Sequence, residues 1–284
     1  MKWRSLEESA QENTTGTLRD SYSQRKELIE KYVPADIQAV HARVVEELKH
    51  SGIADRALKP GNAAPQFELQ DRNGKLVRSS QLLETGPMVV CFFRGRWCPF
   101  CVGQVEAMNA ILPQLREMGA SLVGISPQTV HQKSLMADQH KLSFSLLSDT
   151  GNHLARQFGL VYLVPEYQRE VYKRVFVNLP FVNGDASWEL PIPATYIVWR
   201  ERHNHEGHEG TRRKTAQTQT QQTQSQEAEL QQKQTPKDQN PLVQSTVVGE
   251  LQHVGSVIYA SANPDYTDRP EPADILKRVA QLLS

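Results

Sequence analysis

Two cysteines stand three residues apart in the stretch FFRGRWCPFC. They are Cys98 and Cys101, and they follow Trp97 and two arginines, Arg94 and Arg96. A thiol pair at this spacing can be half of a metal site, a structural disulfide, or a redox centre whose thiolate attacks disulfides or peroxides. The rest of the chain has to decide among these three kinds of site.

The position of the pair in the chain favours redox chemistry. The apolar run MVVCFF before it predicts a buried strand, and the segment after it predicts a helix. A helix N-terminus stabilises a thiolate, and such sites lower a cysteine pKa to about 3.5–7.5. We therefore expect Cys98 to be the nucleophile, and Cys101, one turn further in, to be able to form a disulfide with it. Pro99 suits the first helical turn, and Arg94 and Arg96 are expected to add stabilising positive charge.

The two other kinds of site are less well supported. Three cysteines in 284 residues do not make a disulfide scaffold, and zinc would need a second cysteine pair or a histidine set. The only histidine cluster, His203, His205 and His208, lies in a very polar segment, so we expect no metal. Cys91 lies inside MVVCFF and is expected to be a small buried apolar residue.

The elements around the pair alternate between strands and helices. Strands are expected at MVVCFF, at 121–126, at 143–149, at 195–199 and at 256–260, with helices after the first three and at the C-terminus. Pro113 should interrupt the helix after the cysteines, and Asn73-Gly74 predicts a hairpin. This order predicts an α/β fold, a thioredoxin-like three-layer sandwich with additions.

Two segments extend that core. Residues 1–57 predict an N-terminal helical arm, with a helix that starts near Pro34 and stops at Gly52. The domain then covers 58–284, interrupted by a Gln/Thr-rich insertion at 201–253 that has too few large apolar groups to fold and is expected to be disordered.

Bulk composition limits the partners. Lys+Arg and Asp+Glu are both 32, so the net charge is zero, which favours neither nucleic acid nor an anionic membrane. No apolar run approaches the ~20 residues that span a bilayer, and the N-terminus lacks the apolar region of a secretory signal. We expect a cytoplasmic protein, and an oligomer is possible.

A proline supplies a second redox signal. Pro193 precedes the strand TYIVW in LPIPATYIV. In thioredoxin-like folds such a proline is normally cis and faces the cysteine pair, although a plain strand-start proline is also common. We favour the cis form here.

Several separate blocks, in order, resemble one family. They cover about 58–200 and 254–284 and include PGNAAPQFELQDRNGKLV, FFRGRWCPFC, GASLVGISPQT, LLSDTGNHLARQFGL, GDASWELPIPATYIV and ANPDYTDRPEPADIL. Together they resemble the peroxiredoxin-like branch of the alkyl hydroperoxide reductase/thiol-specific antioxidant family. The resemblance implies a thioredoxin-fold peroxidase without a cofactor. It also implies that Cys98 attacks the peroxide, that Cys101 forms the disulfide, and that thioredoxin or a similar dithiol reductant restores both thiols.

The sequence departs from the usual pattern of that family. Gly95 and Cys91 stand where Thr or Ser and Pro are usual, and the late-strand arginine falls near Pro193. Our hypothesis is that Arg94 or Arg96 partly substitutes by bonding the thiolate and the peroxide; the alternative is that both only solvate the rim of the loop.

Three functions are therefore weighed. The first is a peroxidase acting on hydrogen peroxide or organic hydroperoxides, and the second is a thiol–disulfide oxidoreductase acting on protein disulfides. The third is a redox-sensing or scaffolding protein that uses the Gln-rich insertion. Trp97 either lines the substrate approach or packs against the loop, and Asp265 and Tyr266 are expected to cover the active-site face.

Overall fold

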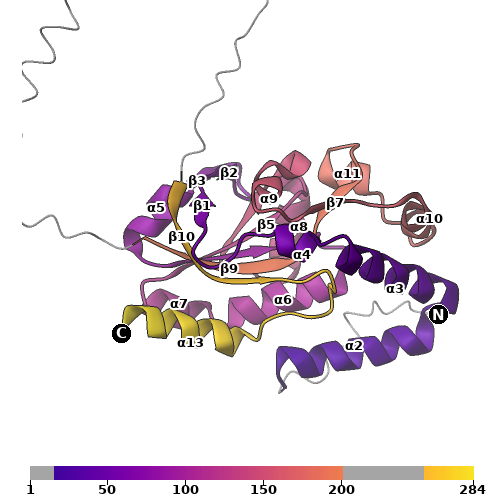
Figure 1. The fold of residues 1–284 in the computed structure, drawn as a ribbon, viewed down its shortest axis with the longest axis horizontal. Helices are drawn as coiled ribbons and strands as arrows, with labels where there is room; N and C mark the ends of the chain where they lie inside the picture. The colour runs from indigo at the N-terminus through magenta and orange to yellow at the C-terminus, as the bar shows by residue number, and fades with distance from the viewer. Residues whose placement is uncertain (1–15, 201–252) are drawn as a thin grey trace, which may run out of the picture. The chain divides into compact units, whose positions relative to one another are not determined.

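A computed structural model describes residues 16–200 and 253–284 (Figure 1). At its centre, the described strands form a mixed sheet with the order β1-β10-β9-β4-β5-β6-β2-β3. These strands span, in chain order, β1 Ala63–Pro65, β2 Glu68–Gln70, β3 Leu76–Arg78, β4 Met88–Phe92, β5 Ser121–Ser126, β6 Ser145–Ser148, β9 Ala194–Trp199 and β10 His253–Ala262. A second sheet pairs β7 (Val161–Leu163) with β8 (Glu189–Pro191).

The middle of the large sheet has the thioredoxin arrangement. β4 runs parallel to β5, and β5 runs parallel to β6, whereas β9 is antiparallel to β4 and β10 is antiparallel to β9. Parallel strands require crossover connections, and here helices supply them. The expected fold, a thioredoxin-like α/β sandwich, is confirmed.

Helices cover both faces of this sheet and complete three layers. The helices that share an apolar core with one face are α2 (Leu18–Tyr32), α6 (Pro99–Ala110), α7 (Leu112–Glu117), α8 (Val130–Gln139) and α13 (Pro272–Leu283). Those that contribute to the core of the other face are α3 (Ala35–His50), α4 (Ile53–Arg56), α5 (Ser79–Thr85), α9 (His153–Gln157), α10 (Glu166–Arg174) and α11 (Leu179–Asn183).

The run MVVCFF is apolar throughout because β4 is buried on both faces. Met88, Val90 and Phe92 belong to one core. Val89 and Cys91 alternate with them and belong to the other. Successive side chains of a strand point to opposite faces, so a central strand has no polar side to show.

Two local predictions, a helix break and a hairpin turn, are confirmed. A new helix, α7, begins at Leu112, so Pro113 does break the helix that follows the cysteines. β2 and β3 pair antiparallel across Asn73-Gly74, where Gly74 has φ 78° and the Asp71 carboxylate accepts the N–H of Asn73.

The predicted N-terminal arm contains three described helices. α3 ends at His50 before the left-handed Gly52, as expected. α2 was not predicted, although Thr17 and Asp20 form a capping box at its start. α2 packs against α6 and α3 packs against α10, so both helices lie on the domain, and the boundary at residue 57 stays a prediction.

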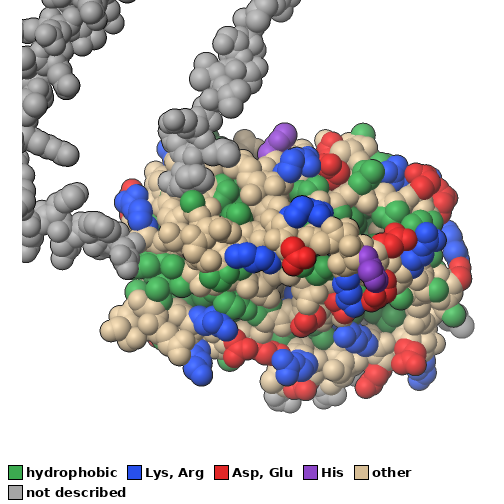
Figure 2. Space-filling view, in the orientation of Figure 1, with side chains coloured by type: hydrophobic (Ala, Val, Ile, Leu, Met, Phe, Trp, Pro, Cys, Tyr) green, Lys and Arg blue, Asp and Glu red, His purple; other side chains and the backbone are tan. Residues whose placement is uncertain are grey.

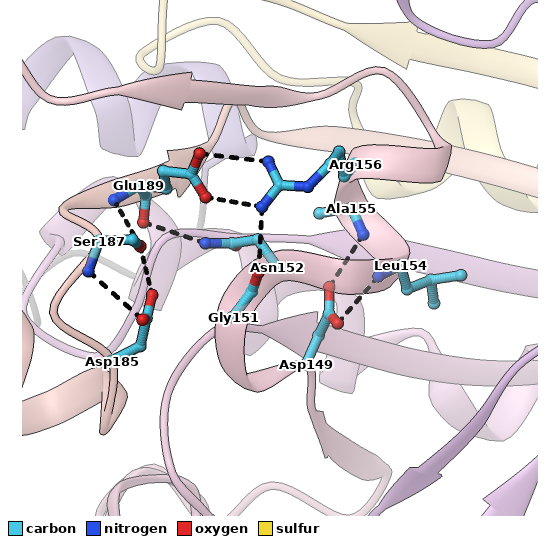
Figure 3. A network of polar contacts seen from close by, with 9 residues as sticks. All are labelled: Asp149, Gly151, Asn152, Leu154, Ala155, Arg156, Asp185, Ser187 and Glu189. Atoms are coloured by element: carbon cyan, nitrogen blue, oxygen red, sulfur yellow. Dashed lines mark hydrogen bonds and ion pairs between the residues drawn. The ribbon is translucent and has the colours of Figure 1, made fainter. Parts of the chain in front are cut away.

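A polar network fastens the segment that leads into β9 (Figure 3). The Asp149 carboxylate accepts the backbone N–H groups of Leu154 and Ala155 at 2.9 Å each, which caps the start of α9. Arg156 on α9 forms a two-pronged ion pair with Glu189 on β8. β8 is thereby held where the chain turns into β9.

Other expectations concern charge and the insertion. On the face in Figure 2, lysine and arginine side chains are interspersed with aspartate and glutamate, in keeping with the zero net charge. No helix among the described residues is long and apolar enough to cross a membrane. The predicted insertion at 201–253 and its histidine cluster lie outside the described residues, except that β10 begins at His253.

We expect Asp149→Ala to lower the free energy of unfolding by about 1–2 kcal/mol, because two helical N–H groups lose their acceptor. Denaturant unfolding of the full chain measures this. Glu117→Ala, at an exposed position near the end of α7, serves as the control and should change stability by less than about 0.5 kcal/mol. Equal stability of both variants would contradict a capping role for Asp149.

Candidate active site

The cysteine pair lies where β4 passes through a short loop into α6. Cys98 is the N-cap residue of α6, and its sulfur accepts the N–H of Cys101 at 3.4 Å. Pro99 occupies the first turn of the helix, where a missing N–H is harmless. Both cysteines are free thiols, and their exposed fractions are only 1% and 0%. The pair is therefore a buried dithiol at a helix N-terminus.

Two buried arginines face the two sulfurs. Arg94 donates from Nη2 to the Sγ of Cys98 at 3.0 Å. Arg269, which comes from the loop between β10 and α13, directs its Nη2 at the Sγ of Cys101 at 3.8 Å. Hydrogen bonds from a cation favour the ionised acceptor, so both arginines favour negative charge on the pair.

The hydrogen bond between the two thiols shifts their pKa values in opposite directions. Burial raises the pKa of the Cys98 thiol well above its ordinary value, and the hydrogen bond with Cys101 raises it further, against the charge of Arg94. Burial also opposes ionisation of Cys101, but the hydrogen bond from Cys98 and the charges of Arg269 and Arg94 bring its pKa well below its ordinary value. This direction for Cys98 is opposite to the low pKa expected from the sequence, because burial outweighs the helix terminus and Arg94.

The third cysteine takes no part in this pair. Cys91 is buried in β4, and burial raises its pKa to about 12. Its sulfur lies 3.9 Å from the Oγ1 of Thr195. The structure thus places it as the small apolar residue that was expected.

Aromatic side chains surround the Arg94 guanidinium. Tyr266 lies under its Cζ at 3.9 Å, and the Trp97 ring lies 5.2 Å from it. Burial opposes the charge of Arg94, but the Cys98 sulfur and the phenol of Tyr172 raise its pKa well above the usual value. Arg94 is therefore a fixed cation beside the sulfur.

Arg96 points in another direction. Its Nε donates to the Oε1 of Gln132 on α8 at 2.7 Å, and its backbone N–H donates to Gln128 at 2.8 Å. In the described structure Arg96 forms no hydrogen bond with either sulfur. Of the two arginines considered from the sequence, Arg94 contacts the thiol and Arg96 fastens the loop to α8.

The expectation of a cis proline is wrong. None of the described peptide bonds is cis, so the bond between Ile192 and Pro193 is trans. Pro193 stands between β8 and β9, where the chain passes from one extended strand into the next, and the more stable trans form meets that need. Pro193 still lines a small cavity together with Arg94 and Tyr266.

A larger cavity opens beside Cys98. Its volume is about 700 Å³, and it is lined by side chains from α2, α3 and α10 and by the loops that carry Arg94 and Tyr266. The apolar lining includes Ile29, Val33, Ile37, Val45, Trp97 and Val177, and exposed charges include Lys26, Glu30, Glu46 and Lys49. The cavity therefore offers an apolar approach to the sulfur.

One lining residue is a neutral histidine. His41 on α3 lies edge-on to Tyr266 at 6.1 Å between ring centroids. Burial, helped by the charge of Arg94, lowers the pKa of His41 to about 4. Its Nδ1 has no hydrogen-bond partner among the described residues. His41 thus adds an uncharged polar group to the cavity near neutral pH.

Several of these residues escaped the sequence analysis. Tyr266 was expected to cover the site, and it does contact Arg94. Arg269 lies three residues further along in the same NPDYTDRP block, whose match to the family was the available signal. His41 and Tyr22, whose hydroxyl donates to the carbonyl of Phe100, gave no signal, because α2 and α3 were interpreted only as an arm. Among the described residues no group of three or more potential metal ligands lies together.

The geometry defines a class of protein: a thioredoxin-fold dithiol oxidoreductase with arginine beside each sulfur. Comparison with known proteins then gives the family. The model of the AhpC/TSA family matches residues 60–203, about half of the chain. The chain belongs to the AhpC/TSA family, as the sequence blocks indicated.

Its relatives include named peroxiredoxins. A Mycobacterium tuberculosis protein named as a peroxiredoxin is 33% identical over 103 residues, which are 36% of this chain and 67% of the relative. Chloroplastic peroxiredoxin Q of Oryza sativa subsp. japonica is 33% identical over 100 residues, which are 35% of this chain but only 46% of the rice protein. These relatives confirm the expected peroxiredoxin-like class of oxidoreductase.

Solved structures that are similar to this chain include proteins named peroxidoxin and peroxiredoxin. Peroxidoxin BcpB from M. tuberculosis is 25% identical, with a TM-score of 0.41 over 50% of this chain and 79% of that one. Peroxiredoxin Q of Xanthomonas campestris is 14% identical, with a TM-score of 0.48 over 81% of this chain and 99% of that one.

Arg94→Met should slow the reaction of the reduced protein with peroxide by about ten- to hundredfold, because a charge-assisted contact contributes about 1.5–3 kcal/mol. Stopped-flow tryptophan fluorescence after mixing with hydrogen peroxide measures the rate. Arg96→Met removes an arginine from the same loop without touching a sulfur and should change the rate by less than about threefold. Similar slowing in both variants would show that the loop, and not the contact with the sulfur, governs the rate.

Proposed function

We propose that the protein is a thiol-dependent peroxidase in which Cys98 is the peroxidatic cysteine and Cys101 the resolving cysteine. The observation that carries this proposal is the Cys98 sulfur beside a 700 Å³ apolar cavity, with Arg94 3.0 Å from it. Membership of the AhpC/TSA family supports the same activity.

The first step needs a thiolate at Cys98. The hydrogen bond between the two cysteines provides a path by which the Cys98 proton passes to the Cys101 thiolate. The Cys98 thiolate then attacks the near oxygen of the peroxide, the O–O bond breaks, and the leaving oxygen takes up that proton to give an alcohol or water. The products are the sulfenic acid of Cys98 and the regenerated thiolate of Cys101.

Arg94 takes the place of the usual polar groups in this step. Gly95 and Cys91 replace a hydroxyl residue and a proline, and Cys91 is buried away from the cavity lining. The Nε of Arg94 has no partner among the described residues, so it is free to donate to a peroxide oxygen while Nη2 holds the sulfur. One guanidinium thus orients the sulfur and polarises the O–O bond.

The cavity supports organic hydroperoxides as substrates. Hydrogen peroxide is about the size of two water molecules and would leave most of the cavity unfilled. An apolar organic group would displace water from Ile37, Val45 and Trp97, which the hydrophobic effect rewards. We therefore propose that the protein reduces organic hydroperoxides with a lower KM than hydrogen peroxide.

The proposed partner is thioredoxin or a similar dithiol reductant, and the proposed location is the cytoplasm. The disulfide product has to be reduced by thiol–disulfide exchange before another turnover. A reducing compartment would keep the three cysteines as thiols between turnovers. Because Cys98 is buried, a protein reductant requires that α2 or the loop that carries Tyr266 move aside.

The alternative, an oxidoreductase of protein disulfides, is less well supported. Such an enzyme presents its attacking sulfur to a large partner, whereas the exposed fraction of Cys98 is 1%. A peroxide can enter the cavity without any movement of the helices, but a folded protein disulfide would need an opened site already in the reduced state.

Cysteine variants test the proposal. With dithiothreitol-reduced thioredoxin as reductant, the protein should consume peroxide, and Cys98→Ser should abolish consumption because the nucleophile is lost. Cys101→Ser should complete one turnover and stop at a sulfenic acid that dimedone traps. Cys91→Ser serves as the control and should retain the activity of the original chain.

Insulin reduction decides between the two candidate functions. Reduction of insulin disulfides without peroxide consumption would favour the alternative and overturn the proposed peroxidase. Loss of peroxide consumption in Cys91→Ser alone would show that the reacting thiol had been assigned to the wrong residue.

Narrowing the cavity should separate substrates by size. Val45→Trp is expected to raise the KM for cumene hydroperoxide about tenfold and to change that for hydrogen peroxide far less. Steady-state kinetics with both peroxides measures the ratio. Ala39→Trp places the same side chain on an exposed part of α3 outside the cavity and should leave the ratio unchanged. An equal rise for both peroxides in Val45→Trp would contradict size-selective binding.

A further inference from the structure

Arg269 reaches the dithiol from the far end of the chain. It lies in the loop between β10 and α13, which short hydrogen bonds hold in shape. The Asp265 carboxylate accepts from both the N–H and the hydroxyl of Thr267, and Asn263 donates to Asp268 at 2.7 Å. The same loop lays Tyr266 on Arg94. The loop therefore places Arg269 beside the Cys101 sulfur and Tyr266 against Arg94, which contacts the Cys98 sulfur.

The Arg269 guanidinium has no conventional partner. It is buried, and its Nε and Nη1 have no hydrogen-bond partner among the described residues. No carboxylate in the described part of the chain forms an ion pair with it, and the acceptor that it reaches there is the Sγ of Cys101. A buried cation is costly without an anion close by, and the only candidate anion here is sulfur.

We propose that Arg269 is a catalytic residue of the resolving step, whose guanidinium keeps the Cys101 sulfur ionised both as attacking and as leaving group. This role rests on the proposed peroxidase function and adds a residue to it. Arg94 serves the sulfur that meets the peroxide, and Arg269 serves the sulfur that closes the disulfide.

In the resolving step the Cys101 thiolate attacks the sulfur of the Cys98 sulfenic acid. The S–S bond forms, the S–O bond breaks, and the hydroxide that leaves takes up a proton from the solvent to become water. The sulfur of Cys98 is reduced and that of Cys101 is oxidised, so no external oxidant or reductant is needed. A neutral Cys101 thiol would be a far weaker nucleophile.

The same contact helps the reverse exchange with a dithiol reductant. Cys98 lines the cavity and Cys101 does not, so an incoming thiolate meets the sulfur of Cys98 first. The S–S bond then breaks, and Cys101 leaves with the electron pair. Stabilising that thiolate makes it a better leaving group.

Other groups act on Cys101 from every side. Cys98 and Arg94 face it from the redox loop and Tyr22 from α2, while Arg25 on α2 binds the carbonyl of Pro99 at 2.6 Å. The Cys98 thiol and the phenol supply no positive charge. Arg269 and Arg94 are thus the cations that lower the pKa of Cys101.

The test titrates Cys101 alone. In a Cys98→Ser background, the ultraviolet absorbance of the thiolate is followed against pH with and without Arg269→Met. We expect half-ionisation of Cys101 to move up by about one pH unit or more, which is a tenfold change in the ionisation constant. In the protein with both cysteines, disulfide formation follows the reaction with peroxide as a second kinetic phase whose rate does not depend on the peroxide concentration. Arg269→Met should slow this phase about tenfold at neutral pH, and raising the pH should restore its rate.

The matched control is Arg278→Met, which removes an exposed arginine of α13 that lies over Tyr259 and forms no hydrogen bond with a sulfur in the described structure. It should leave the titration unchanged. An unshifted titration in Arg269→Met, or an equal shift in Arg278→Met, would overturn the proposal. If Arg269→Met does not fold by circular dichroism, Arg269→Gln, which keeps a polar side chain in the loop, takes its place with the same expectations.

The titration uses no peroxide, so it separates two kinds of failure. A chain that consumes no peroxide but shows the shift would lose the proposed function and keep the Arg269 contact. A chain that consumes peroxide and shows no shift would keep the function and lose the role of Arg269.

Discussion

The attraction between two buried guanidinium groups and two buried sulfurs is the interaction on which the site depends. Neither arginine has a carboxylate partner in the described structure, and each directs a nitrogen at one thiol. Without negative charge on sulfur, two guanidinium cations would be buried without an anion, which costs a large desolvation free energy. The arginines therefore make a shared thiolate the stable form of a pair that burial alone would keep neutral.

The fold has to bring three distant segments together to build this arrangement. The strand β4 and the helix α6 set both sulfurs on one turn, and the loop before α13 adds Arg269 and Tyr266. α2 closes the remaining side: the Tyr22 hydroxyl donates to the carbonyl of Phe100, and the Glu271 carboxylate accepts the N–H groups at the start of α2. α2 and the loop before α13 are thus structural parts of the active site.

Sequence patterns predicted the features that depend only on neighbouring residues. The apolar run of β4, the break at Pro113 and the hairpin at Asn73-Gly74 each follow from neighbouring residues. The sequence placed Cys98 and Cys101 at the site, and Arg94 and Tyr266 with them. It missed Arg269 and His41, because packing between distant segments brings these two to the sulfurs and the cavity. The expected low pKa of Cys98 failed for the same reason, since burial is a property of the folded chain. The prediction of a cis bond before Pro193 was wrong because it came from an analogy with other thioredoxin folds and not from the neighbouring residues.

The order in which the chain is made gives the contact of Arg269 a further meaning. Cys101 and Arg269 are separated by 168 residues, which a ribosome adds in roughly 10–30 s. Throughout that interval the nascent Cys101 thiol lacks this counter-charge and has a pKa near the ordinary ~8.5. The low pKa of Cys101 therefore arises only after the ribosome has passed residue 269, so the resolving thiolate is acquired late and in a fixed order relative to synthesis of the two cysteines.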